Sequence, residues 1–258
     1  MLRTLLTVAL CMAFSSAGVS QMKTPNDASI DEKLGKQIAM DIVLKDENAQ
    51  DITLRQLVDK PTVLTFNYYR CPGICPVLLN SMVEVVNQSE MQPGKDYRLI
   101  SVSFDPADTP EQAKEKKANY LNMLKRQFSP DAWHFLTGSA ENTRAVADSA
   151  GFNYRKEGDM YVHPGVIVVL TPQGIISRYL YGTTFLPADV TMAVREAAGG
   201  KVRPTISKVL AFCYTYDPAG RTYAFSVTRF AGAAVLVLAL IFVIFVLRGK
   251  ARKKGQTS

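Results

Sequence analysis

The chain has 258 residues, a length that allows one large domain or two small ones, and its 47% apolar residues suffice for one sizeable core. Its 30 basic and 23 acidic residues give a net charge of +7, but Arg3 and the five basic residues after position 247 supply six of those charges. Residues 21–247 therefore carry only +1, and this excludes the basic folded surface that nucleic-acid binding needs.

The first twenty residues have the pattern of a signal peptide. Arg3 precedes an apolar run over residues 5–14, and the small residues from Ser15 to Ser20 offer a cleavage site. The apolar run is too short to span a bilayer, so residues 1–20 predict export followed by cleavage. The polar residues 21–37 predict a flexible leader.

Alternating β-rich apolar runs and capped helical segments predict one α/β domain over residues 38–200. The run from Thr62 to Tyr68 is typical of a strand covered on both faces. Pro76 places Cys75 at a helix N-cap, and Thr109 with Gln112 forms a capping box. In chain order the predicted elements are a hairpin over 42–44 and 52–54, strand 62–68, helix 75–88, strand 97–104, helix 110–126, strand 133–136, helix 141–150 capped by Ser139, a hairpin over 165–170 and 175–181, and helix 188–198.

The end of the chain predicts a membrane anchor after an extension, residues 201–228, whose pattern assigns no fold. Residues 229–247 predict a single transmembrane helix, since the eighteen uncharged residues from 230 on would form roughly 27 Å of helix. The basic tail 248–258 is then cytoplasmic by the positive-inside rule. Together with the short signal peptide, this predicts a bacterial inner-membrane protein whose folded domain lies in the periplasm.

Three cysteines remain once Cys11 leaves with the signal peptide: Cys71, Cys75 and Cys213. Cys71 and Cys75 flank three residues in a loop that leads into a helix, where the helix dipole and Arg70 favour the thiolate form. Such thiolates exchange disulfides or hold a soft metal. A structural disulfide is the alternative, but a disulfide that closes so short a loop adds little stability.

At three places the residues resemble the Sco/SenC family. These are the segment Tyr69 to Pro76 with its CPxxCP motif, the segment Val102 to Pro110, and His163 ahead of a strand. The resemblance covers residues 38–200 and implies a thioredoxin-like fold with an added hairpin. It also implies that Cys71, Cys75 and His163 hold one copper ion, as Cu(I) or Cu(II), in a donor set that suits both states.

The function implied by the resemblance is that of a membrane-anchored metallochaperone. It would deliver copper to the dinuclear copper centre on the copper-bearing subunit of cytochrome c oxidase, after loading by a copper donor and reduction by a thiol reductant that the sequence does not identify. Two alternatives stay open. One is an enzyme, a thiol–disulfide oxidoreductase with Cys71 and Cys75 as its redox pair, although such enzymes have two residues between the cysteines. The other is a scaffold for the oxidase.

The remaining candidates have modest predicted roles. His134 alternates with core residues and is predicted to be structural. Asp105 and Asp108 follow a strand, where capping and turn formation are favoured over support of the site or docking of a partner. Cys213 is predicted to be a buried apolar residue, with a resolving thiol, an extra copper ligand or a link to a partner as the alternatives. Three residues are predicted to pack around the site without binding metal: Tyr68, Tyr69 and Met160.

Overall fold

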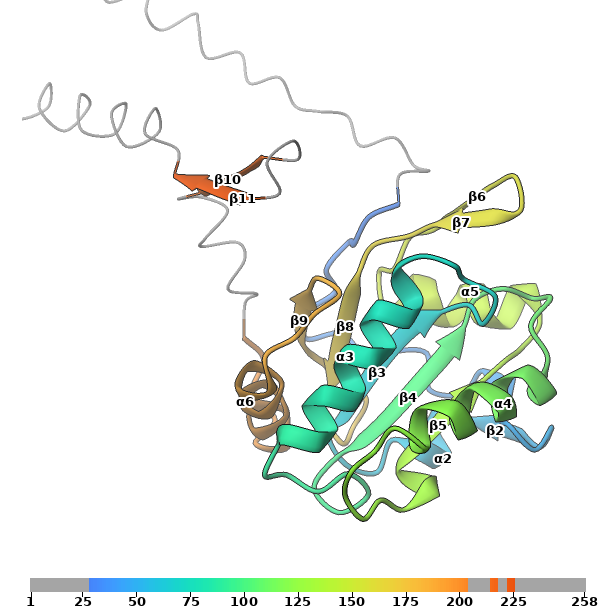
Figure 1. The fold of residues 1–258 in the computed structure, drawn as a ribbon, viewed down its shortest axis with the longest axis horizontal. Helices are drawn as coiled ribbons and strands as arrows, with labels where there is room; N and C mark the ends of the chain where they lie inside the picture. The colour runs from blue at the N-terminus through green and yellow to red at the C-terminus, as the bar shows by residue number, and fades with distance from the viewer. Residues whose placement is uncertain (1–27, 204–213, 218–221, 226–258) are drawn as a thin grey trace, which may run out of the picture.

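The computed structural model describes residues 28–203, 214–217 and 222–225 (Figure 1). The predicted signal peptide, transmembrane helix and cytoplasmic tail all lie outside these residues. Within the described residues, no helix has both the length and the apolar character needed to cross a membrane.

A five-stranded sheet with the order β5-β4-β3-β8-β9 forms the centre of the domain. β3 is parallel to β4, which is parallel to β5, whereas β8 is antiparallel to both β3 and β9. Every residue of β3 and β8 is buried, and for β3 the unbroken apolar run predicted this. The strands are β3 (Thr62–Asn67), β4 (Arg98–Ser103), β5 (Trp133–Leu136), β8 (Val166–Leu170) and β9 (Ile176–Tyr181).

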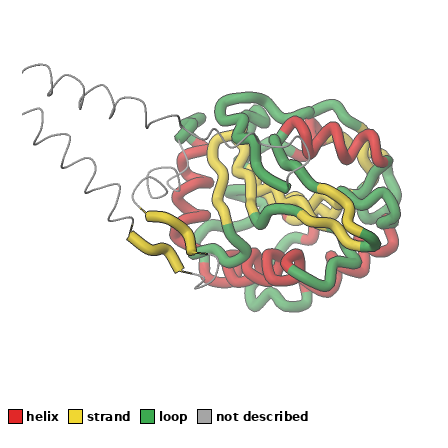
Figure 2. The backbone as a smooth tube through the Cα atoms, turned by 90° about the horizontal axis from the view of Figure 1, so that it is seen from above, coloured by secondary structure: helices red, strands yellow, loops and turns green. Residues whose placement is uncertain are grey.

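Helices lie on both sides of this sheet, and each layer closes its own apolar core (Figure 2). α3, α4 and α6 supply buried side chains to one core, and α2 and α5 supply the other. This arrangement confirms the predicted α/β domain. The helices are α2 (Leu54–Leu57), α3 (Ile74–Gln88), α4 (Pro110–Leu121), α5 (Ala140–Ser149) and α6 (Pro187–Ala198), with a 3-10 turn at Pro130–Ala132.

The predicted helix starts are confirmed at α4 and α5, but one predicted helix end is wrong. Thr109 and Gln112 form the capping box of α4, and Ser139 accepts a hydrogen bond at the start of α5. α4 ends at Leu121 and not near residue 126. The chain turns there because the Lys125 N–H donates to the side chain of Asn87 at 2.8 Å, which draws the segment onto α3.

Part of the predicted flexible leader packs against the domain. Ile30 forms a β-bridge with Phe152, Gln37 forms one with Ile175, and Ile30 packs against the core together with Leu34. These apolar side chains in an otherwise polar segment explain why residues 28–37 lie on the domain.

Three small hairpins complete the described structure. The entry hairpin of β1 (Val43–Lys45) and β2 (Asp51–Thr53) was predicted. A second, of β6 (Arg155–Glu157) and β7 (Met160–Val162), was not, because strands of three mostly exposed residues carry no apolar alternation. Its signal was the two-residue Gly-Asp turn, in which Gly158 has φ +60°. In the extension, β10 (Tyr214–Asp217) pairs antiparallel with β11 (Thr222–Phe225).

Candidate metal centre

The sheet topology brings three chain segments to one edge. The carboxyl ends of β3 and β4 share this edge because these strands are parallel. β8 begins at the same edge because it is antiparallel to β3, with Ile167 opposite Thr65. The cysteine loop follows β3, the two aspartates follow β4, and His163 precedes β8. Residues that are distant in the sequence therefore meet.

The three predicted ligands lie together at this edge. The Sγ atoms of Cys71 and Cys75 and a ring nitrogen of His163 all lie within 4.8 Å of one another. Cys75 Sγ is 3.3 Å from His163 Nε2. Neither cysteine forms a disulfide in the structure. Three donor atoms at this spacing can hold one metal ion.

Cys75 belongs to the first turn of α3 and does not cap it, so the predicted helix start is wrong by two residues. Gly73 is the N-cap, and Cys75 is the second helical residue. The helix tolerates Pro76 at its third position because the first four N–H groups of a helix have no intrahelical partner. Cys75 is thereby buried, with 3% exposure, while Cys71 stays partly exposed in the loop.

His163 presents one defined nitrogen to the sulfur atoms. Its Nδ1 lies 3.2 Å from the carbonyl oxygen of Pro164. Since a carbonyl can only accept a hydrogen bond, this contact assigns the proton to Nδ1 and leaves Nε2 with a free lone pair toward Cys75. The ring packs among aromatic side chains, with centroid distances of 5.2 Å to Phe104 and 6.1 Å to Tyr68. The histidine is therefore fixed in a ligating orientation.

The two cysteines differ in protonation. The pKa of Cys71 is lowered to about 3, chiefly because Cys75 donates a hydrogen bond to it; a hydrogen bond from the Gly73 N–H adds to this against the effect of burial. The same hydrogen bond, together with burial, raises the pKa of Cys75. Without metal the pair therefore holds one thiolate and one thiol, and metal binding must release the proton of Cys75.

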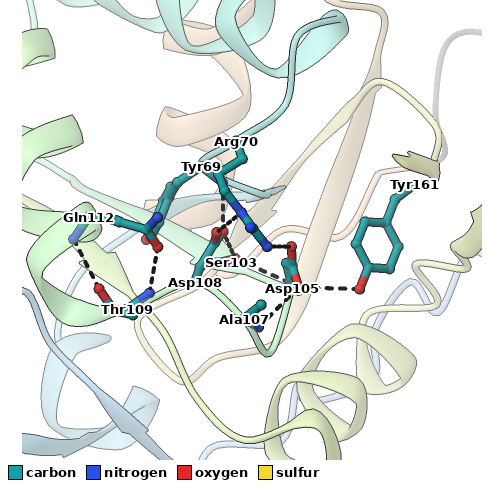
Figure 3. Close-up of polar contacts among 9 residues, drawn as sticks. All are labelled: Tyr69, Arg70, Ser103, Asp105, Ala107, Asp108, Thr109, Gln112 and Tyr161. Carbon is teal, nitrogen blue, oxygen red and sulfur yellow. Dashed lines mark hydrogen bonds and ion pairs between the residues drawn. The ribbon is translucent and has the colours of Figure 1, made fainter. Parts of the chain in front are cut away.

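Asp108 anchors the cysteine loop to the end of β4 (Figure 3). Its Oδ2 accepts hydrogen bonds from the Tyr69 N–H and the Ser103 hydroxyl, each at 2.6 Å. Burial raises the pKa of this carboxyl, against the effect of these hydrogen bonds. Its role is broader than the predicted capping, because it holds the backbone two residues before Cys71.

Asp105 lies beside Asp108 and contacts the cysteine loop and the β6–β7 hairpin (Figure 3). Its Oδ1 accepts from the Ala107 N–H at 3.0 Å, which is the predicted turn role. Its Oδ2 is 3.1 Å from Arg70 Nη2, and Tyr161 donates its hydroxyl to Oδ1 at 3.3 Å. Sequence reasoning missed Tyr161, whose position two residues before His163 is set by the unpredicted β6–β7 hairpin.

A pocket of about 280 Å³ adjoins the three ligands, between the cysteine loop and the β6–β7 hairpin. Cys71 and His163 line it, together with Tyr68 and Met160. Two of the three donor residues therefore border a pocket, while Cys75 is not among its lining residues. A larger groove of about 750 Å³ between α3 and α6 is lined by none of them.

The other candidates lie apart from this site. Tyr69 packs against Phe135 in the opposite core and donates to the Leu136 carbonyl, so its predicted place around the site is wrong. His134 lies on β5, with Nε2 3.3 Å from Arg98 Nη1, as expected for a structural residue. Cys213 lies outside the described residues.

Comparison with known proteins gives a family match over most of the domain. The family model described as SCO1/SenC matches residues 30–199. A Stutzerimonas stutzeri protein named "Putative copper-binding protein" is 26% identical over 184 residues, which cover 69% of this chain and 86% of that protein. Against the mitochondrial SCO proteins of Arabidopsis thaliana, Bos taurus, Homo sapiens and Mus musculus, the alignment spans only 37–52% of their length.

Solved structures show the same fold. The Arabidopsis thaliana ScoI structure with copper bound is 26% identical, with a TM-score of 0.52 over 62% of this chain and 96% of that one. BsSco, described with a disulfide switch and as a member of the Sco family of cytochrome c oxidase assembly proteins, is 25% identical, with a TM-score of 0.53 over 66% and 98%. The predicted thioredoxin-like fold is therefore confirmed for the described domain.

Proposed function

The chain belongs to the SCO1/SenC family, and on that premise we propose that it is a metallochaperone that carries one copper ion on Cys71, Cys75 and His163. The observation that carries the proposal is the convergence of these three donor atoms within 4.8 Å beside an open pocket. The recipient proposed is the dinuclear copper centre of cytochrome c oxidase.

The donor set fits copper as cargo. Two thiolates and one imidazole are soft enough for Cu(I) and acceptable to Cu(II). A site with three protein ligands leaves a coordination position for an incoming ligand from the recipient. Because Cys71 and His163 line the pocket, that ligand can approach while the buried Cys75 holds the ion from within.

The proposed partner and location have separate support. BsSco, a structural relative, is described as a member of a family of cytochrome c oxidase assembly proteins. The predicted transmembrane segment 229–247, which is uncharged from residue 230 on, and the basic tail after it support an inner-membrane anchor with a periplasmic domain. Anchoring in the bilayer of the recipient would raise the effective concentration of the carrier near that recipient.

A thiol–disulfide oxidoreductase is the second candidate, because the pair at this site combines a thiolate with a neighbouring thiol. In that role Cys71 would attack a disulfide of an envelope protein and form a mixed disulfide. Cys75 would then attack Cys71, which releases the reduced substrate and leaves the pair oxidised. This chemistry does not need His163, so it leaves the position of that residue unexplained.

Copper stoichiometry tests the two candidates. The full-length chain is reduced anaerobically and loaded with Cu(I) or Cu(II), beside a Cys71→Ser, Cys75→Ser double variant. About one tightly held copper per wild-type chain and none in the variant is the expected result. If the wild-type chain binds no copper tightly but forms a readily reducible Cys71–Cys75 disulfide, the oxidoreductase becomes the favoured function. Normal oxidase assembly by the double variant would contradict both and favour a scaffold.

A further inference from the structure

Asp105 contacts both of the segments that carry the ligands. Arg70, which directly precedes Cys71, places Nη2 3.1 Å from Asp105 Oδ2. Tyr161, two residues before His163, donates its hydroxyl to Oδ1 at 3.3 Å. Figure 3 shows the carboxylate between these two side chains. One buried group thus joins the cysteine loop to the hairpin that leads to the histidine.

The carboxylate itself is held in place by its own loop. Asp105 is 6% exposed, its N–H donates to the Ser103 hydroxyl at 3.2 Å, and its Oδ1 accepts from the Ala107 N–H at 3.0 Å. These contacts fix the side chain relative to the end of β4. A fixed carboxylate can define the positions of the groups that bind to it, whereas a mobile one would follow them.

The hairpin has no place in the central sheet, so its position depends on side chains. β6 and β7 pair with each other in a separate two-stranded sheet. The centroid of the Tyr161 ring lies 5.2 Å from that of Tyr68 and 5.5 Å from that of Phe104. Such packing is largely non-directional, and a hydrogen bond adds a preferred distance and angle. The Tyr161–Asp105 hydrogen bond is therefore suited to fixing the approach of His163 to the sulfur atoms.

We propose that Asp105 is a positioning residue that sets the distance of His163 from the cysteine pair through its bonds to Arg70 and Tyr161. The inference rests on the proposed copper site and deepens it. Two thiolates alone suit Cu(I), whereas Cu(II) needs the imidazole. Loosening the Arg70–Asp105–Tyr161 bridge therefore weakens Cu(II) binding and leaves Cu(I) binding nearly unchanged, a selective effect that general destabilisation does not produce.

The test compares three variants of the full-length chain. Tyr161→Phe removes one hydroxyl, and Asp105→Asn keeps the shape of the side chain but removes its charge. Tyr154→Phe is the matched control, because Tyr154 belongs to the same aromatic cluster and packs 5.9 Å from Tyr161 without a hydrogen bond to Asp105 among the described contacts. Three quantities are measured for each variant. They are the affinities for Cu(II) and Cu(I), the nitrogen hyperfine coupling of bound Cu(II), and the backbone amide exchange of residues 158–163 in the metal-free chain.

In Tyr161→Phe the Cu(II) affinity is expected to fall about fivefold, the equivalent of one lost hydrogen bond. The nitrogen hyperfine coupling should weaken, and the amides of residues 158–163 should exchange faster without metal. Wild-type Cu(II) affinity and exchange in both variants would overturn the positioning role. Equal losses of Cu(I) and Cu(II), or the same change in Tyr154→Phe, would also overturn it. Failure of the wild-type chain to bind copper would instead overturn the proposed function, and the metal-free exchange would still test the bridge.

Discussion

Cys75 Sγ lies 3.3 Å from His163 Nε2, although 88 positions separate the two residues in the chain. The thiol comes from the first turn of α3 and the imidazole from the segment that leads into β8. Both side chains are buried, and without metal the Cys75 thiol keeps its proton, which it donates to Cys71. A metal ion that replaces this proton finds its donors already in position.

Removal of the imidazole should separate the two copper oxidation states. In His163→Ala, Cu(II) affinity is expected to fall beyond the roughly 10–100-fold that loss of an outer-shell partner costs, because a direct ligand is lost. Cu(I) affinity should fall much less, since both thiolates remain. Competition titrations with chelators of known affinity measure both values. His134→Ala is the control and should match the wild type, and equal losses of Cu(I) and Cu(II) in His163→Ala would contradict the assignment.

The lowered pKa of Cys71 should appear as thiol reactivity in acid. A pKa of about 3 keeps Cys71 ionised as the pH falls from 8 to 5, so its alkylation rate in the reduced, metal-free chain should stay nearly constant over that range. Iodoacetamide labelling read by peptide mass spectrometry measures this, and the buried Cys75 should remain unlabelled. In Cys75→Ser the thiol donor is replaced by a hydroxyl, and the variant reports how far Cys71 depends on it. A wild-type rate that rises tenfold per pH unit toward pH 8 would rule out the stable thiolate.

Asp108 should be important for the stability of the domain. Asp108→Ala leaves the buried Tyr69 N–H and the Ser103 hydroxyl without their acceptor, which should lower the free energy of unfolding by about 2–3 kcal/mol. Urea unfolding followed by tryptophan fluorescence measures the change, because Trp133 is fully buried. Asp159→Ala, at an exposed turn, should stay within about 0.5 kcal/mol of the wild type. Equal stability of the two variants would show that the loop does not depend on Asp108.

Two glycines with similar backbone angles should respond differently to alanine. Gly151 has φ +66°, and a Cβ there would lie 1.8 Å from the Asp31 carbonyl oxygen, so the N-terminal segment would have to move. Gly158 has φ +60° with nothing within 4 Å, so only the left-handed conformation costs energy, about 1 kcal/mol. Urea unfolding should show a clearly larger loss for Gly151→Ala. Proteolytic cleavage before residue 38 should also increase in Gly151→Ala alone. Equal losses of stability in the two variants would contradict the close contact between residue 151 and the Asp31 carbonyl oxygen.

The sequence predicted the regular elements because their signals are local. The apolar runs of β3 and β8, the capping box at Thr109 and the Ser139 cap all appear as expected. The wrong or missing predictions have identifiable causes. The β6–β7 hairpin is too short and exposed to show periodicity, and the end of α4 depends on Asn87, a residue of another helix. The packed residues 28–37 were missed because two apolar side chains in a polar segment have no recognisable period.

For the candidate site, the sequence by itself determined the chemistry: two cysteines in a proline-rich loop at a helix start, one distant histidine, and the family resemblance that joined them. Only the tertiary structure decided which residues support them. The Tyr69 side chain lies in the opposite core, and Asp108 accepts a hydrogen bond from the backbone of the cysteine loop. Asp105 lies between Arg70 and Tyr161 and contacts both. The physical reason is that ligand type is a property of single residues, whereas a hydrogen bond between loops depends on the parallel β3–β4 pairing and the antiparallel β8, which no local pattern specifies.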